Sequence, residues 1–162
     1  MLNFLNKNFY INFFIVLIIF VLDRITKLYV TNFYENNNVI DLLNSKFLNI
    51  RLIWNEGIAF GLFSFSEKYF YNILTLVISL VIFIIFFMIR NTSGLKRYSL
   101  LMILGGALGN LFDRIVFSAV PDFIDFHFNN FHWFIFNVAD IFITLGVIIM
   151  IMTEFFNKKE NK

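Results

Sequence analysis

The chain has 162 residues, of which 59% are hydrophobic, 15% are charged and 25 are Phe. Soluble domains have about 45–50% apolar and about 25% charged residues, so this composition excludes an ordinary soluble domain and predicts a membrane protein. The absence of Cys excludes disulfides and thiolate metal sites, and a net charge of +2 gives no reason to expect a nucleic-acid partner.

Four segments are candidates for transmembrane helices, each of which needs roughly 20 mostly apolar residues. The segment at 69–89 contains no charged residue. The segments at about 9–29, 98–117 and 131–153 reach that length only when their charged residues are counted inside them. We therefore predict an α-helical membrane protein in which residues 1–162 form a single membrane domain with four transmembrane helices.

The distribution of basic residues predicts the orientation of these helices, because Lys and Arg are enriched in cytoplasmic loops. With the N-terminus inside, three basic residues fall in the outer loops: Lys46, Arg51 and Lys68. Seven fall on the cytoplasmic side: Lys7, Arg90, Lys96, Arg97, Lys158, Lys159 and Lys162. Both termini are therefore expected in the cytoplasm.

The first outer loop, about 31–68, is long and patterned. Apolar and polar residues alternate from Leu48 to Trp54, which is typical of a half-buried strand. An Asn55-Glu56-Gly57 turn and a second apolar run at 58–65 follow. This pattern predicts a small extracytoplasmic β-sheet, or cradle, between helices 1 and 2.

Charged residues lie near the ends of the first and third spans, which run outward, and in the first half of the fourth span, which runs inward. They are Asp23 and Lys27 in the first span, Asp113 and Arg114 in the third, and Asp140 in the fourth. This topology places all of them in the outer third of the membrane. Ionisable groups at that depth usually face a bundle interior or a wet cavity, so we expect one shared polar pocket.

Several of these positions have a structural interpretation as well as a functional one. Asp23 and Lys27 are four residues apart on one helix face, so they form either an ion pair or part of a site. Gly105 and Gly109 have the spacing of closely packed helices. Asn137 and Asp140 share a face, and Asp140 has no basic residue within a turn, which favours a functional role.

The second outer loop supplies further candidates. Spacing alone does not choose between Asp122 and Asp125. His127 and His132 are five residues apart, but a His-Glu-x-x-His pattern and Cys are both absent, so we interpret them as interfacial histidines and expect no metal site.

Five segments in order resemble those of the bacterial lipoprotein signal peptidases, the signal peptidase II family. The segments are 23–27 (DRITK), 55–61 (NEGIAFG), 105–114 (GGALGNLFDR), 120–126 (VPDFIDF) and 136–140 (FNVAD). They extend from the first predicted span to the last. One departure is Pro121, where the family commonly has a second Val.

The resemblance implies a catalytic pair, Asp122 and Asp140, and thus favours Asp122 over Asp125. It implies eight supporting or substrate-binding positions: Asp23, Lys27, Asn55, Gly57, Gly106, Asn110, Arg114 and Asn137. Arg114 would bind substrate, or pair with Asp113 or an acid elsewhere. Asn55 and Gly57 would meet substrate, or Asn55 would only form a turn.

The resemblance further implies an aspartyl endopeptidase of the bacterial inner membrane, with its active site near the outer face. Its substrates would be diacylglyceryl-modified prolipoproteins, cut before the lipidated Cys, and globomycin would inhibit it. We expect contact with membrane lipids, no cofactor and a monomer. Two neighbouring carboxyl groups can share a proton and act as base and acid. The alternative is a small ion- or proton-coupled transporter subunit that uses the buried carboxylates.

Overall fold

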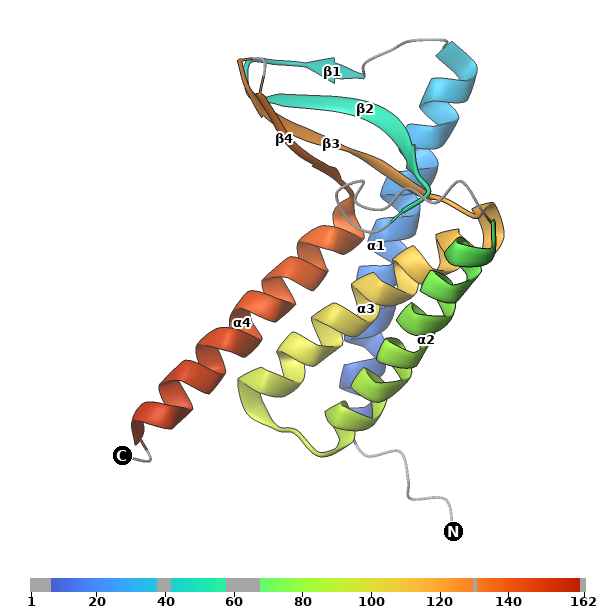
Figure 1. The fold of residues 1–162 in the computed structure, drawn as a ribbon. Helices are drawn as coiled ribbons and strands as arrows, with labels where there is room; N and C mark the ends of the chain where they lie inside the picture. Colours follow the sequence, from blue (N-terminus) through green and yellow to red (C-terminus); the bar gives the residue numbers. More distant parts are fainter. Residues whose placement is uncertain (1–6, 38–41, 58–67, 130, 161–162) are drawn as a thin grey trace.

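The computed structural model describes residues 7–37, 42–57, 68–129 and 131–160. Within these ranges, four helices carry a four-stranded antiparallel sheet at one end (Figure 1). The start of the first helix, the connection between the second and third, and the end of the fourth lie at the opposite end (Figure 1). In chain order the elements are α1 (Lys7–Asn37), β1 (Leu43–Asn44), β2 (Leu48–Asn55), α2 (Lys68–Arg90), α3 (Gly94–Phe117), β3 (Val120–Phe128), β4 (Phe131–Phe136) and α4 (Val138–Glu160).

Three helices in the described part of the chain, α2, α3 and α4, are long and apolar enough to cross a membrane. α1 is longer than any of them, but it carries Asp23, Arg24 and Lys27 near its middle. Large apolar side chains project outward from the helices, among them Leu76 on α2 and Ile115 on α3. A chain of this size exposes so much apolar surface only where lipid rather than water surrounds it.

Two hydroxyl groups of α2 form hydrogen bonds within the helix. The hydroxyl of Thr75 donates to the carbonyl of Tyr71, and the hydroxyl of Ser79 donates to the carbonyl of Thr75. Such bonds to the preceding turn satisfy the hydroxyl groups of Thr75 and Ser79 without water. α2 therefore matches the charge-free segment predicted at 69–89.

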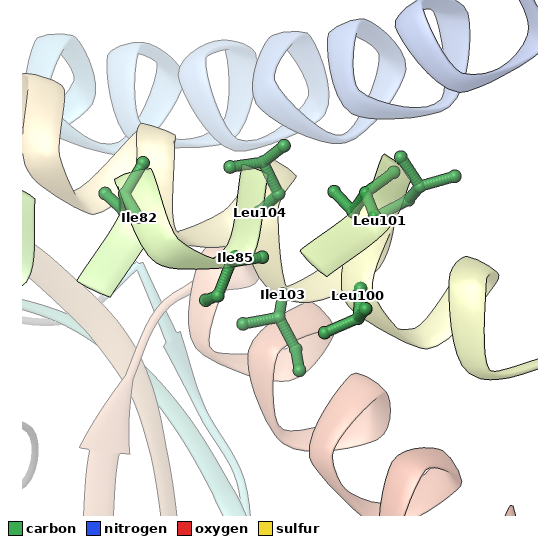
Figure 2. Packing of buried hydrophobic residues seen from close by; sticks show 7 residues of the cluster. Ile82, Ile85, Leu100, Leu101, Ile103 and Leu104 are labelled. Atoms are coloured by element: carbon green, nitrogen blue, oxygen red, sulfur yellow. The ribbon is translucent and has the colours of Figure 1, made fainter. Parts of the chain in front are cut away.

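The apolar core lies where α2 packs against α3 (Figure 2). α3 also contacts α1 and α4, so it is the central helix of the bundle. Seven buried side chains form the core cluster: Ile82, Ile85, Ile89, Leu100, Leu101, Ile103 and Leu104.

Glycines of α3 permit close helix contacts. A Cβ atom at Gly105 would lie 2.9 Å from the Cβ of Ile19 on α1. A Cβ at Gly109 would lie 2.5 Å from the Oδ2 of Asp23, also on α1. The predicted close packing through Gly105 and Gly109 is confirmed, because any larger side chain at these positions would push α1 away from α3.

The sheet has the strand order β1-β2-β3-β4 and is antiparallel throughout. The predicted strand at 48–54 is confirmed as β2, whereas the run at 58–65 lies outside the described residues. The placement of the whole sheet between helices 1 and 2 was wrong, since β3 and β4 come from the connection between α3 and α4. Sequence alternation finds a single strand but not its partners, which long-range pairing decides.

Two helix ends differ from the bounds of the predicted spans. α1 continues to Asn37, and the hydroxyl of Tyr34 near its end donates to the carbonyl of Ile50 on β2. The fourth span does not begin at 131, because residues 131–136 form β4 and α4 begins at Val138. The aromatic residues of β4 are apolar but pair with β3, so hydropathy alone could not separate this strand from the helix.

Pro121 is accommodated at one end of β3. It is opposite Trp54 of β2, and β4 pairs with β3 only from Ile124 onward. Among the described residues, the strand therefore has an unpaired edge at Pro121, which is where a residue without a backbone N–H is tolerated in a sheet.

Candidate active site

Four charged side chains form a buried cluster between α1 and α3. The guanidinium of Arg24 forms a bidentate pair with Asp113, at 2.5 and 2.6 Å. The Nζ of Lys27 lies 2.7 Å from Asp113 and 3.0 Å from Asp23. The i, i+4 ion pair predicted between Asp23 and Lys27 is thus present, but as part of a cluster of two acids and two bases that neutralise each other.

Arg114 does not take part in this cluster, so the suggested pairing of Arg114 with Asp113 was wrong. Its guanidinium donates instead to the carbonyls of Asn110, at 3.2 Å, and Gly57, at 3.3 Å. On a helix, Arg114 follows Asp113 by one residue and therefore projects in a different direction. Arg24 and Lys27 of α1 are the residues that face Asp113.

Lys27 connects the charged cluster to a network of amide side chains. Its Nζ donates to the Oδ1 of Asn110 at 2.8 Å, and only 2% of the Lys27 side chain is exposed. The same Oδ1 accepts a hydrogen bond of 3.2 Å from Asn137. With its oxygen held this way, the Nδ2 of Asn110 points to Asp140 and donates to its Oδ1 at 2.8 Å.

Asp140 lies in the first turn of α4 and forms a reciprocal cap with Asn137. The N–H of Asp140 donates to the Oδ1 of Asn137, and the N–H of Asn137 donates to the Oδ2 of Asp140, both at 3.1 Å. This is the geometry of a capping box, which satisfies donors that a helix start leaves unpaired. The Oδ1 of Asp23 accepts from a third N–H, that of Ala139.

Asp122 lies near the start of β3, and two amides bind its carboxylate. Asn55 donates to the Oδ2 at 2.8 Å and Asn137 donates to the Oδ1 at 2.6 Å. Burial, followed by the negative charge of Asp140, raises the pKa of Asp122 to about 6, and the two amide hydrogen bonds oppose that rise. Asn137 therefore contacts both carboxyl groups of the predicted pair.

Both carboxyl groups line one pocket of about 290 Å³ between the helices and the sheet. The polar lining also includes Thr144 and four further predicted positions: Asn55, Asn110, Arg114 and Asn137. The apolar lining includes Ile78, Ala107, Val120 and Ile143. Among the described lining residues, Arg114 is the only cation, and its Nε has no hydrogen-bond partner within the described ranges.

The predicted glycines have structural roles beside the pocket. The N–H of Gly57 donates to the Oδ1 of Asn55 at 2.9 Å, so Asn55 stabilises the turn, while its Nδ2 donates to Asp122. A Cβ at Gly106 would lie 2.5 Å from the carbonyl oxygen of Ala139. Gly106 therefore lets the start of α4 approach α3.

Asp125 is separated from this pocket, although it is only three residues from Asp122. Alternation along β3 places the two side chains on opposite faces of the sheet. Asp125 is fully buried and contacts His132 and Arg51. Geometry thus distinguishes two acids that sequence spacing could not. The group in the described ranges that could hold a metal ion is Asp125, His127 and His132, outside the pocket.

The family resemblance did not name Arg24 or Asp113 as site residues, although the expected polar pocket included Asp113. Their signal was the presence of two further charges within otherwise apolar segments, which required partners across the bundle. Sequence reasoning also missed the helix start at Asn137, for which the Asn-x-x-Asp spacing of Asn137 and Asp140 was an available capping signal.

Comparison with known proteins adds independent information. Residues 15–156 match the family model described as signal peptidase (SPase) II. The chain is 52% identical to a lipoprotein signal peptidase of Pelagibacter ubique (strain HTCC1062), over 96% of this chain and 95% of that protein. It is 42% identical to one of Anaplasma phagocytophilum (strain HZ), over 85% and 86% of the two chains.

Solved structures agree with these relatives. Two structures described as bacterial membrane enzymes, determined by the in meso method, have TM-scores of 0.74 and 0.66 to this chain. Their identities are 28% and 29%, over 93% and 88% of this chain and 91% and 90% of theirs. Family and apolar helices together indicate a protease of the bacterial inner membrane. The chain belongs to the signal peptidase II family.

Proposed function

We propose that this protein is an intramembrane aspartyl endopeptidase in which Asp122 and Asp140 are the catalytic pair. Its substrates are prolipoproteins that carry diacylglycerol on a Cys, and it cuts the peptide bond before that Cys. The observation that carries the proposal is the shared pocket, in which Asn137 contacts both carboxyl groups.

The pair suits proton transfer during hydrolysis of a peptide bond. Two carboxyl groups in one buried site share a proton, because both cannot ionise at little cost. The ionised member takes a proton from water as the water oxygen attacks the carbonyl carbon, and the protonated member donates to the carbonyl oxygen. As the C–N bond breaks, a proton passes to the leaving nitrogen, which yields a carboxylic acid and an amine. These roles belong to the pair rather than to either residue.

The charges around the pocket favour one negative charge on the pair. Asp23 and Asp113 are neutralised by Arg24 and Lys27, so this cluster adds no net charge. Arg114 then balances a singly protonated pair. In the described part of the chain its guanidinium donates to two carbonyls, over distances above 3 Å, so it is available to bind a substrate carbonyl or an ester oxygen of the lipid.

The membrane arrangement follows from the same proposal. α1 crosses the membrane in addition to α2, α3 and α4. Its charges are tolerated because Asp23 and Lys27 face α3 rather than lipid. Both termini lie in the cytoplasm, and the sheet lies on the outer surface. The diacylglycerol remains in the bilayer while the peptide enters the pocket beneath the sheet.

A cleavage assay on a purified, diacylglyceryl-modified precursor tests the catalytic pair. Asp122→Asn and Asp140→Asn are each expected to lower kcat by at least about 10³-fold, since neither amide can exchange a proton. Glu35→Gln is the matched control, because it makes the same chemical change at an exposed position. Full cleavage by either Asp variant would refute the proposed pair. Activity that disappears with a metal chelator and returns with metal would refute the metal-free mechanism.

A further inference from the structure

The hairpin of β3 and β4 places three metal-binding side chains on one face of the sheet. Asp125 and His127 are two residues apart on β3 and therefore point to the same face. His132 on β4 is directly opposite His127. This face is opposite to that of Asp122, so the group is separate from the catalytic pocket.

A β-bulge is responsible for the position of His132. Phe126 pairs with Phe134, but the next residue, His127, pairs with His132, so Trp133 is an extra residue in β4. With regular pairing, position 133 would face His127 and His132 would project from the other face. Bulges of this kind redirect individual side chains. Here the redirected side chain is the third potential ligand.

The three side chains are close enough for a single ion. Their ligand atoms all lie within 4.8 Å of one another. The imidazole rings have centroids 5.2 Å apart, and the Nδ1 of His132 lies 2.9 Å from the carboxylate of Asp125. Two ligands bound tetrahedrally to Zn²⁺ at about 2.0–2.1 Å are about 3.4 Å apart, so closure requires the ligand atoms to approach one another by up to about 1.4 Å.

Burial and hydrogen bonding at this group also favour a cation. Asp125 is fully buried, and the only ion pairs to it in the described part of the chain involve His132 and Arg51. The Nε of Arg51 lies 3.2 Å from its Oδ2 without forming a hydrogen bond. The Nδ1 of His127 is buried and has no hydrogen-bond partner among the described residues. Unpaired buried polar atoms are rare and call for an explanation.

We infer that Asp125, His127 and His132 form a binding site for a divalent transition metal, with Zn²⁺ as the best match. Two imidazoles and one carboxylate are a common ligand set for this ion, and His132 is exposed enough to leave a fourth position for water. This assignment replaces the expectation of interfacial histidines without a metal, because the third ligand becomes visible only through the strand register. The ion would clamp β3 to β4 and would take no part in peptide hydrolysis.

Metal titration of the purified full-length protein tests the site, and the protein must be prepared without a polyhistidine tag. Since the chain has only two His residues, imidazole ligation reports on this group alone. We expect saturable binding of one Zn²⁺ per chain and a higher melting temperature with Zn²⁺. Co²⁺ in place of Zn²⁺ should give the visible absorption of a tetrahedral site with nitrogen and oxygen ligands.

Single substitutions locate the binding. His127→Gln and His132→Gln should each weaken Zn²⁺ binding by at least about tenfold, since even outer-shell changes at metal sites cost that much. Both variants change side chains that are not fully buried, and their melting temperatures without metal serve as the folding check. Arg51→Gln removes the neighbouring cation and should bind Zn²⁺ at least as tightly as the wild type.

Two results would overturn the inference. One is the absence of saturable Zn²⁺ binding up to millimolar concentrations. The other is binding that remains unchanged in the His127→Gln/His132→Gln double variant, which would assign the ion to other surface groups. Neither result bears on the catalytic pair, because the cleavage assay with Asp122→Asn and Asp140→Asn tests that proposal.

Discussion

Asn137 and Asp140 cap one another at the start of α4, each accepting a hydrogen bond from the other's backbone N–H. The same Asn137 donates to Asp122 on β3. One side chain therefore begins a helix, orients one carboxyl group of the proposed pair and holds the other. This dual role makes the contributions of Asn137 to stability and to activity separable by substitution.

We predict that Asn137→Ala loses both contributions and that Asn137→Ser restores only one. Ser is a good N-cap residue, so it should recover most of the roughly 1 kcal/mol of stability that Ala loses. Its short hydroxyl cannot replace the 2.6 Å bond to Asp122, so kcat should remain about 10²-fold low in both variants. Thermal unfolding and cleavage kinetics measure the two effects. Full activity in Asn137→Ser would show that the contact with Asp122 is dispensable.

The pH dependence of cleavage should report the raised pKa of Asp122. Asp122 loses its proton with a pKa of about 6, so above that pH it is no longer the protonated member of the pair. We therefore expect kcat/KM of the wild type to decrease as the pH rises through about 6. The pKa of the falling limb should be that of the carboxyl pair in the free enzyme, because the pH dependence of kcat/KM reports ionisations of the free enzyme.

Asn55→Ala tests the assignment of that limb. The amide of Asn55 stabilises the ionised form of Asp122 and thus lowers its pKa. Its removal should raise the pKa and move the falling limb of the kcat/KM profile to higher pH. A limb that stays in place, or moves to lower pH, would assign the titration to another group. Glu35→Gln, at an exposed position, should leave the limb unchanged.

Gly106→Ala should destabilise the protein, although Ala is the better helix former by about 1 kcal/mol. The added Cβ would lie 2.5 Å from the backbone carbonyl of Ala139, which cannot move without displacing α4. We expect a net loss of roughly 1–3 kcal/mol and lower activity, since Asp140 shifts with its helix. Ile115→Ala, at a mostly exposed position on the same helix, is the control. Unfolding midpoints in detergent and cleavage rates provide the comparison.

The stability of variants in the charged cluster should depend on the net charge of the cluster rather than on the number of ion pairs that remain. Lys27→Met leaves Asp23 and Asp113 with Arg24 alone, and breaking a buried pair in this way costs about 3–5 kcal/mol. In Lys27→Met/Asp113→Asn the cluster is neutral again, so this double variant should be more stable than Lys27→Met alone. A double-mutant cycle measures the coupling. Strictly additive losses would contradict the neutral-cluster interpretation.

The sequence by itself determined the chemical class of the protein and much of its site. Low charge and the uncharged segment at 69–89 established a membrane protein, because a helix that crosses a bilayer needs about 20 mostly apolar residues. The five segments that resemble the family identified six residues that line one pocket: Asn55, Asn110, Arg114, Asn137, Asp122 and Asp140. Local patterns also found β2 and the ion pair of Asp23 with Lys27.

Tertiary structure alone decided which groups face each other. Hydropathy could not distinguish β4 from a helix. Sequence spacing could not separate Asp122 from Asp125, because strand register assigns side chains to faces only once the partner strand is known. The partners of Asp113 come from α1, 86 and 89 residues away in the chain. Such contacts depend on helix packing that glycines permit, and the bulge at Trp133 that brings His132 to Asp125 follows from pairing rather than from composition.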